Sequence, residues 1–111
     1  MSPPTRITAT LVTVLDVFLD DPAAERFGMD VMRATGFPSG TVYPILTRLL
    51  SAGWLDAHWE QIDPVREGRP ARRWYRLTAL GLRSAQAEVA AYQRRHAPRR
   101  SAANARLTWE S

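Results

Sequence analysis

The hydrophobic pattern of this chain changes period twice, and this change constrains the fold more than any other feature of the sequence. Residues 39–50, SGTVYPILTRLL, place apolar side chains on a 3.6-residue period, which predicts an amphipathic helix. Residues 54–62, WLDAHWEQI, and residues 72–78, RRWYRLT, alternate apolar and polar side chains, which predicts two half-buried strands. The helical period returns after residue 78. The chain therefore needs an α+β fold that is mainly helical with a small β-hairpin.

Two further helices are predicted ahead of residue 39. The first covers residues 6–19 and is ended by residues 20–22, DDP, whereas the second covers residues 27–34 and is ended by Gly36. Gly53 ends the third helix in the same way. The inward face of the first helix is expected to consist of Ile7, Leu11, Val14, Leu15 and Phe18.

The two predicted strands are joined by residues 63–71, DPVREGRPA, which contain two prolines and a glycine and are typical of a turn. Three helices followed by a hairpin with a basic tip describe a winged helix, a form of helix-turn-helix domain. In such a domain the third helix enters the major groove of DNA. The hairpin tip, or wing, reaches the neighbouring phosphates or the minor groove. Residues 39–50 take the position of the recognition helix.

The alternation also predicts which strand residues face inward. Leu55, Ala57 and Trp59 share one face of the first strand. In the second strand Arg73 falls on the same inner side as Tyr75, where its aliphatic stem is expected to pass the core and support the structure.

The recognition helix opens with residues that a helix interior tolerates poorly, Gly40 and Pro44. If Ser39 is the N-cap, Pro44 costs one hydrogen bond, to the carbonyl of Gly40. If Thr41 is the N-cap, Pro44 lies in the first turn and costs none. Either start leaves backbone amides unpaired, and such amides bind phosphate. Gly40 also lets the DNA backbone approach closely.

The outward face of this helix carries Tyr43, Thr47, Arg48 and Ser51. A tyrosine in this place suits a phosphate or base contact, and the alternative of a half-buried ring on a neighbouring element stays open. Arg48 is placed either to grip a guanine edge with two hydrogen bonds or to clamp a phosphate.

The chain carries a formal net charge of +4, and its basic charge is unevenly spread. Residues 1–38 hold three arginines and five acids, residues 39–76 six arginines and four acids, and residues 77–111 six arginines and two acids. Basic charge in the second and third parts fits one face that meets a polyanion. A solvated surface explains the same charge equally well.

The final helix, expected over residues 79–96 with Thr78 as its cap, has a narrow apolar seam. A narrow seam on a heptad spacing favours one partner helix, and so a dimer contact. Packing on the chain's own domain is the alternative. The seam consists of Leu82, Ala85, Val89, Tyr92 and His96.

Several functional classes find no support in the sequence. The chain has no cysteine, and His58 and His96 lie far apart, so no metal-ligand spacing is present. There is no paired-carboxylate, Ser/His/Asp or phosphate-loop pattern, so we expect neither an enzyme nor a cofactor. The apolar run over residues 7–15 is too short to cross a bilayer. A cytoplasmic protein with no membrane partner is therefore expected.

Three groups of residues resemble the PadR family of bacterial transcriptional regulators. They are the stretch SGTVYPILTRLLSAGWL, the strand that ends in WYRLT, and the glycine that follows it. The resemblance covers about residues 8–92, although Phe27 and Met29 depart from the usual pattern of the second helix. The matching residues are Gly40, Thr41, Val42, Tyr43, Pro44, Leu46, Arg48, Leu49, Tyr75, Arg76, Leu77, Thr78 and Gly81.

The resemblance implies a homodimer that binds double-stranded DNA at a near-palindromic operator and represses transcription, often until a small-molecule effector releases it. It implies dimerisation through the last helix with help from Leu11 and Leu15 of the first. Trp54 and Tyr92 are the candidates for an effector site. The expected DNA contacts are Ser39, Gly40, Thr41, Tyr43, Pro44, Thr47, Arg48, Arg66, Gly68, Arg69 and Arg72.

The expected organisation is a winged-helix domain over residues 1–78, a dimerisation helix over residues 79–97 and a basic, flexible tail over residues 98–111. The alternative function is a winged-helix module that binds protein and not DNA. Arginines at positions 48, 66 and 69 favour DNA, although Asp63 and Glu67 reduce the basic charge of the wing.

Overall fold

The computed structural model describes residues 6–96, so the predicted tail, including Pro98 and Trp109, lies outside the described residues. The described part of the chain is mostly helical with a small antiparallel sheet. Its elements in order are α1 (Ala9–Asp20), β1 (Arg26–Phe27), α2 (Gly28–Thr35), α3 (Ser39–Ser51), β2 (Leu55–Trp59), α4 (Pro64–Glu67), β3 (Arg73–Leu77) and α5 (Ala79–His96).

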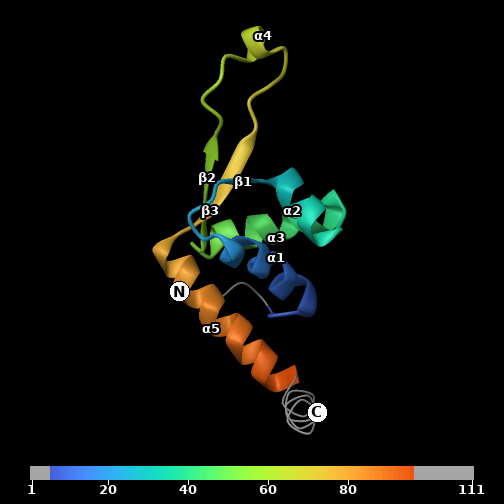
Figure 1. Cartoon of the computed structure of the whole chain (residues 1–111), viewed down its shortest axis with the longest axis vertical. Coiled ribbons are helices and arrows are strands. Elements are labelled where there is room, and N and C mark those ends of the chain that lie inside the picture. The colour runs from blue at the N-terminus through green and yellow to red at the C-terminus, as the bar shows by residue number, and fades with distance from the viewer. Residues whose placement is uncertain (1–5, 97–111) are drawn as a thin grey trace, which may run out of the picture.

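Helices α1, α2 and α3 form a body at one end of the β2–β3 hairpin (Figure 1). The hairpin projects away from this body and carries α4 at its tip, and α5 runs away on the opposite side. The predicted order of three helices, a hairpin and a final helix is confirmed. The structure adds two short elements, β1 and α4, that the sequence pattern did not predict.

One apolar core holds the body together. Four residues of the face predicted for α1, Leu11, Val14, Leu15 and Phe18, are buried, whereas Ile7 lies ahead of the helix and is only partly buried. The apolar stripe predicted for α3 packs against this face: Val42, Ile45, Leu46 and Leu49 are buried, and Leu50, the fifth predicted residue, is partly buried. Helix α1 starts at Ala9 and not at residue 6, the start predicted from the sequence. Thr8 is its N-cap, because the Thr8 hydroxyl accepts a hydrogen bond from the Leu11 amide at 3.2 Å.

The sheet has three strands in the order β1-β3-β2, and both pairs are antiparallel. Leu55 of β2 lies opposite Leu77 of β3, and Arg26 of β1 lies opposite Tyr75. The strand β1 is only two residues long, so it shows no alternation for a sequence pattern to reveal. It ends where α2 begins, because the Asp30 carboxylate accepts the amide of Phe27 at 2.8 Å.

The prediction of a helix over residues 79–96 capped by Thr78 is confirmed. The Thr78 hydroxyl accepts the Gly81 amide at 2.9 Å and donates to the carbonyl oxygen of Gly53 at 2.7 Å. Gly81 packs against the backbone of Trp54, where a Cβ atom would overlap the Trp54 carbonyl. This contact explains why a glycine follows the last strand.

Helix α5 packs on α1 within the same chain. Leu15 and Ala85 are fully buried in that contact, so the prediction that they face a partner chain is wrong. Leu11 and Val89 are also buried, which leaves them almost no surface for a partner. The part of the seam formed by Ala85 and Val89 therefore packs within its own domain, the alternative that the sequence left open.

Candidate nucleic-acid interface

Helix α3 presents a polar side to solvent opposite its buried stripe. Tyr43, Pro44, Thr47 and Arg48 are all exposed on that side, as predicted. The helix contains no acidic residue, so Arg48 is its only charged side chain. This exposed side therefore carries hydrogen-bonding groups and one positive charge.

The start of α3 differs from both predicted starts. Neither Ser39 nor Thr41 is the N-cap, because Pro38 holds that position. The amide of Thr41 donates to the Pro38 carbonyl at 3.0 Å, so it is not free for a phosphate. Gly40 is exposed, and nothing lies within 4 Å of the place where its Cβ atom would be. Open space beside Gly40 lets a ligand backbone approach the helix.

Tyr43 combines the two interpretations that the sequence left open. Its side chain is 42% exposed. The rest of the ring lies over Gly28 of α2, where a Cβ atom would overlap the phenol group. Gly28 is therefore the residue that lets Tyr43 lie flat between α2 and α3 while it keeps its exposed edge.

Arg48 is tethered to its own helix. Its Nε atom donates to the carbonyl oxygen of Pro44 at 3.3 Å. The two residues lie four positions apart, so this bond holds the Arg48 side chain along the surface of α3. The terminal amino groups of Arg48 remain at the exposed end of the side chain, where a bidentate contact would form.

The wing, defined here as residues 60–72, is more ordered than the predicted turn. Its tip is the short helix α4, which the Asp63 carboxylate begins by accepting the Val65 amide at 3.1 Å. Gly68 ends it with φ 69°, a left-handed conformation that favours glycine. Arg66 lies in α4 and is exposed at the tip.

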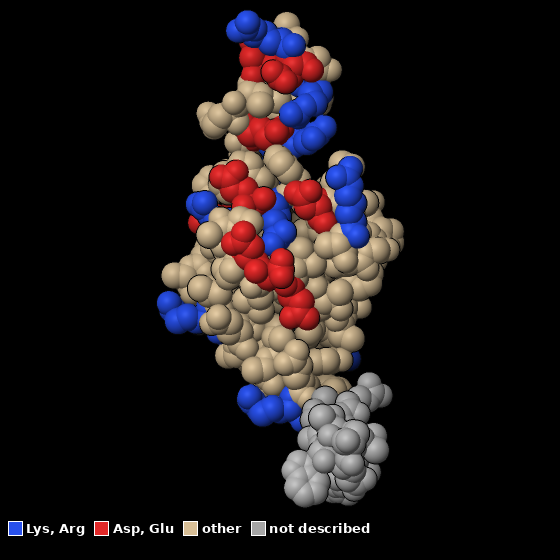
Figure 2. Space-filling view, viewed as in Figure 1, with Lys and Arg blue, Asp and Glu red and all other residues tan. Residues whose placement is uncertain are grey.

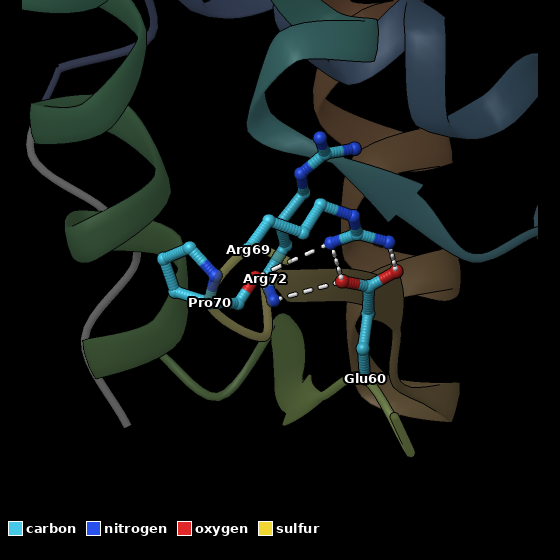
Figure 3. Close-up of polar contacts among 4 residues, drawn as sticks. All are labelled: Glu60, Arg69, Pro70 and Arg72. Carbon is cyan, nitrogen blue, oxygen red and sulfur yellow. Dashed lines mark hydrogen bonds and ion pairs between the residues drawn. The ribbon is translucent and has the colours of Figure 1, made fainter. Parts of the chain in front are cut away.

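Arg69 is not a free cation, in contrast to its predicted role. Its Nη1 and Nη2 atoms donate to Oε1 and Oε2 of Glu60 at 2.7 and 3.2 Å (Figure 3). The same carboxylate accepts the Arg72 amide at 2.9 Å. The hydrogen bond from Arg69 holds the pKa of the Glu60 carboxyl below its ordinary value, and Glu60 in turn raises the pKa of Arg69. Arg69 thus holds the two ends of the wing together.

Trp59 and Arg73 form a pair that sequence reasoning missed. They lie directly opposite each other on β2 and β3, and the Arg73 guanidinium carbon is 5.6 Å from the Trp59 ring centroid. They share the face of the sheet that buries Leu55 and Tyr75. Trp59 is nevertheless 60% exposed, because the hairpin extends beyond the body. The prediction that both side chains pack at the core is therefore wrong.

The two residues predicted for an effector site differ in how deeply their side chains are buried. Trp54 is 3% exposed and belongs to the core, so its predicted place in an effector site is wrong. Tyr92 is half-buried, and its ring stacks on His96 with centroids 4.1 Å apart. Leu82 is also partly exposed, so Leu82, Tyr92 and His96 keep surface that a partner could contact.

Charge is segregated over the surface. Figure 2 shows acidic side chains gathered over the middle of the body, on the side where α1 lies in Figure 1. Basic side chains gather around the wing, with acidic ones between them. This face of the body would repel a polyanion, so a nucleic acid is expected at another side that includes the wing.

The match to a protein-family model decides the family. Residues 25–87, more than half of the chain, match the transcriptional regulator PadR-like family. The chain belongs to the PadR-like family of transcriptional regulators. The matched part runs from just before β1 into α5, so it contains α3 and the whole wing. No curated protein matches this PadR-like chain in sequence.

Solved structures show the same winged-helix fold. A PadR family transcriptional regulator from Eggerthella lenta has a TM-score of 0.60 at 22% identity, over 76% of this chain and 75% of that one. The PcaV transcriptional regulator from Streptomyces coelicolor has a TM-score of 0.63 at 19% identity, over 96% and 72%.

AbfR of Staphylococcus epidermidis is similar over a smaller share of its own length. It has a TM-score of 0.58 at 22% identity, and the match covers 74% of this PadR-like chain and 50% of AbfR. The chain therefore spans about half the length of AbfR. PadR-like proteins are transcriptional regulators and not enzymes.

Two further observations concern the described residues alone. Within residues 6–96, no group of three or more histidine and acidic side chains is arranged to hold a metal ion. None of the helices in that part of the chain is long and apolar enough to cross a membrane.

Proposed function

We propose that this protein is a sequence-specific DNA-binding transcriptional regulator. The observation that carries the proposal is the exposed side of α3, which offers Tyr43, Thr47 and Arg48 and has no acidic residue. Core packing does not account for these residues, since the opposite side of the helix supplies the packing. In a winged helix this is the side that enters the major groove.

Each exposed residue of α3 has a role in this proposal. Arg48 contacts a guanine edge or a phosphate with its free amino groups, and Thr47 contacts a base edge. The exposed part of the Tyr43 ring contacts the DNA backbone. Ser39, Gly40, Thr41 and Pro44 lie at the start of the helix, where the DNA backbone passes.

The wing supplies contacts beside the recognition helix. Arg66 at the tip and Arg72 at the base reach phosphates, and Gly68 allows the turn between them. Arg73, whose guanidinium lies over the Trp59 ring, adds a further cation. It lies on the same face of the sheet as Leu55 and Tyr75, at the end of the hairpin that extends beyond the body. Arg69 contributes mainly by holding the wing in shape, because Glu60 occupies its guanidinium.

In this proposal the protein acts as a homodimer. Residues 1–78 form the DNA-binding domain, and residues 79–97 carry the contact between copies through Leu82, Tyr92 and His96. A dimer with a two-fold axis reads an inverted repeat, so the operator is near-palindromic. Binding over a promoter blocks transcription, which makes the protein a repressor that works in the cytoplasm.

A small-molecule effector completes the proposal. PcaV, which shares the fold, has been solved in complex with its natural ligand. In this chain the half-buried Tyr92 offers an aromatic surface on α5, beside the proposed contact between copies. A ligand there would change the separation of two recognition helices and so release the operator.

Selection of bound duplexes from a random DNA library tests this function. We expect an enriched inverted repeat whose half-sites lie about 10 base pairs apart, or a multiple of that, centre to centre. The Arg48→Ala variant is run in parallel: a guanine contact predicts loss of the enrichment at one position of each half-site, and a phosphate contact predicts weaker enrichment of the whole motif. Enrichment of no motif by the full chain would contradict the proposal and favour a protein-binding module.

A further inference from the structure

A cavity of about 170 Å³ lies between the start of α1 and the segment of α3 from Gly40 to Arg48. Arg6, ahead of α1, and Arg48 of α3 both line it. Its lining contains no acidic residue. Two positive charges from segments far apart in the sequence therefore share one hollow with no negative charge to balance them.

Neither arginine is paired within the described part of the chain, where the one ion pair joins Arg69 to Glu60. Arg48 is held by its Nε bond to the Pro44 carbonyl, which fixes the guanidinium beside the cavity. Fixing a cation before a ligand arrives reduces the entropy that binding costs. A free guanidinium with donors in a rigid fork matches the geometry of carboxylate and phosphate.

Hydroxyl groups supply further donors. Thr10 of α1 and Thr41 of α3 line the cavity, and neither hydroxyl forms a hydrogen bond within residues 6–96. The apolar side chains of Leu11 and Ile45 also line it. At about 30 Å³ per water molecule, the cavity has room for a small group together with ordered water.

We propose that this cavity binds a phosphate group, clamped by Arg6 and Arg48 and hydrogen-bonded by Thr10 and Thr41. The bound phosphate group has two candidate sources, the backbone of DNA and free inorganic phosphate. The cavity shares Gly40, Thr41 and Arg48 with the exposed side of α3. A DNA strand lying along α3 would bring a backbone phosphate to its mouth, and this part of the inference rests on the proposed function.

The first test uses inorganic phosphate and the full chain. Backbone amide shifts are recorded while phosphate is added, with sodium chloride adjusted to hold ionic strength constant. We expect saturable shifts confined to residues near Arg6, Thr10 and Thr41. Arg6→Gln should abolish them and Thr10→Val should weaken the affinity several-fold. Arg83→Gln is the matched control, because Arg83 is exposed on α5 and outside the cavity.

The second test distinguishes the two sources. The affinity for a duplex is measured across a salt series for the wild type, Arg6→Gln and Arg83→Gln. A DNA phosphate in the cavity predicts that Arg6→Gln lowers the log–log salt slope by about 0.9, as expected for one lost phosphate contact, whereas Arg83→Gln does not. Localised phosphate shifts with an unchanged slope would assign the cavity to free phosphate.

The outcome that overturns the inference is separate from failure of the proposed function. Absence of localised phosphate shifts together with an unchanged slope for Arg6→Gln would contradict the phosphate site even when the wild type binds its operator. Conversely, a wild type that binds no DNA contradicts the proposed function, and the phosphate titration then decides the cavity alone.

Discussion

Glu60 and Arg69 meet across the base of the wing, with Arg69 Nη1 2.7 Å from Glu60 Oε1 and Nη2 3.2 Å from Oε2. The same carboxylate accepts the amide of Arg72. One acidic side chain therefore closes the loop that carries α4 and also neutralises one of the wing's arginines. The wing therefore has fewer free cations than its sequence indicates.

The two wing arginines should differ in their contribution to DNA affinity. Arg66→Ala is expected to lower the log–log salt slope of binding by about 0.9, because Arg66 lies at the exposed tip and forms no ion pair with any of residues 6–96. Arg69→Ala should lower the slope by clearly less, because Glu60 already neutralises its charge. A salt series with both variants checks this, and equal slopes would show that Arg69 leaves Glu60 when DNA binds.

The Glu60 carboxyl should titrate below its ordinary pKa, since the hydrogen bond from Arg69 favours its charged form. A lowered folded-state pKa means that the pair stabilises the wing fully above the ordinary carboxyl pKa. That stabilisation is lost as the pH falls through the lowered value. The amide proton shift of Arg72 should follow the same titration in NMR spectra. In Glu60→Gln that pH-dependent shift should vanish, and its persistence would count against the contact.

One substitution at two glycines should change stability in opposite directions. Gly81→Ala places a Cβ atom against the Trp54 backbone, which is not free to move, and should lower the free energy of unfolding by about 1–3 kcal/mol. Gly40→Ala meets open space inside a helix and should raise it by about 0.5–1 kcal/mol. Urea denaturation at one protein concentration measures both. A Gly81→Ala variant as stable as wild type would refute the packing of Gly81 on Trp54.

The contact between copies should depend on the exposed part of α5. Leu82→Glu is expected to shift the sedimentation coefficient from dimer to monomer, because it would bury a carboxylate in an apolar contact. Gln86→Glu adds the same charge at an exposed position on the same helix and should leave the dimer intact. If Leu82→Glu sediments as wild type does, the proposed surface on α5 is wrong.

Much of the fold follows from periodicity. The stripes of α1 and α3 and the full extent of α5 were predictable, because each buries a regular set of side chains over three or more turns. The strand β1 was not, since two residues carry no period. Trp59 and Arg73 follow the alternation of inward-facing residues, but they lie where the hairpin extends beyond the helical body. The sequence pattern does not show how far along the hairpin the core reaches.

The sequence predicted which residues of the candidate site are exposed on α3, but not which residues and helices contact one another. The order of elements placed Tyr43, Thr47 and Arg48 on the exposed side of α3. The sequence could not show that Glu60 meets Arg69, because they lie nine positions apart in the sequence with a short helix between them. It also could not show that α5 packs on α1, because a seam of this spacing fits a helix of the same chain as well as one of a partner.

The most direct test of sequence-specific DNA recognition compares binding to the DNA just upstream of the protein's own gene with binding to an unrelated fragment of equal length, across a salt series. We expect tight binding to the upstream fragment, weak binding to the other, and a steep salt dependence for both. Arg48→Ala should weaken binding to the upstream fragment and leave the unfolding transition unchanged. Weak and equal binding of the wild type to both fragments, together with no selected motif, would contradict such recognition.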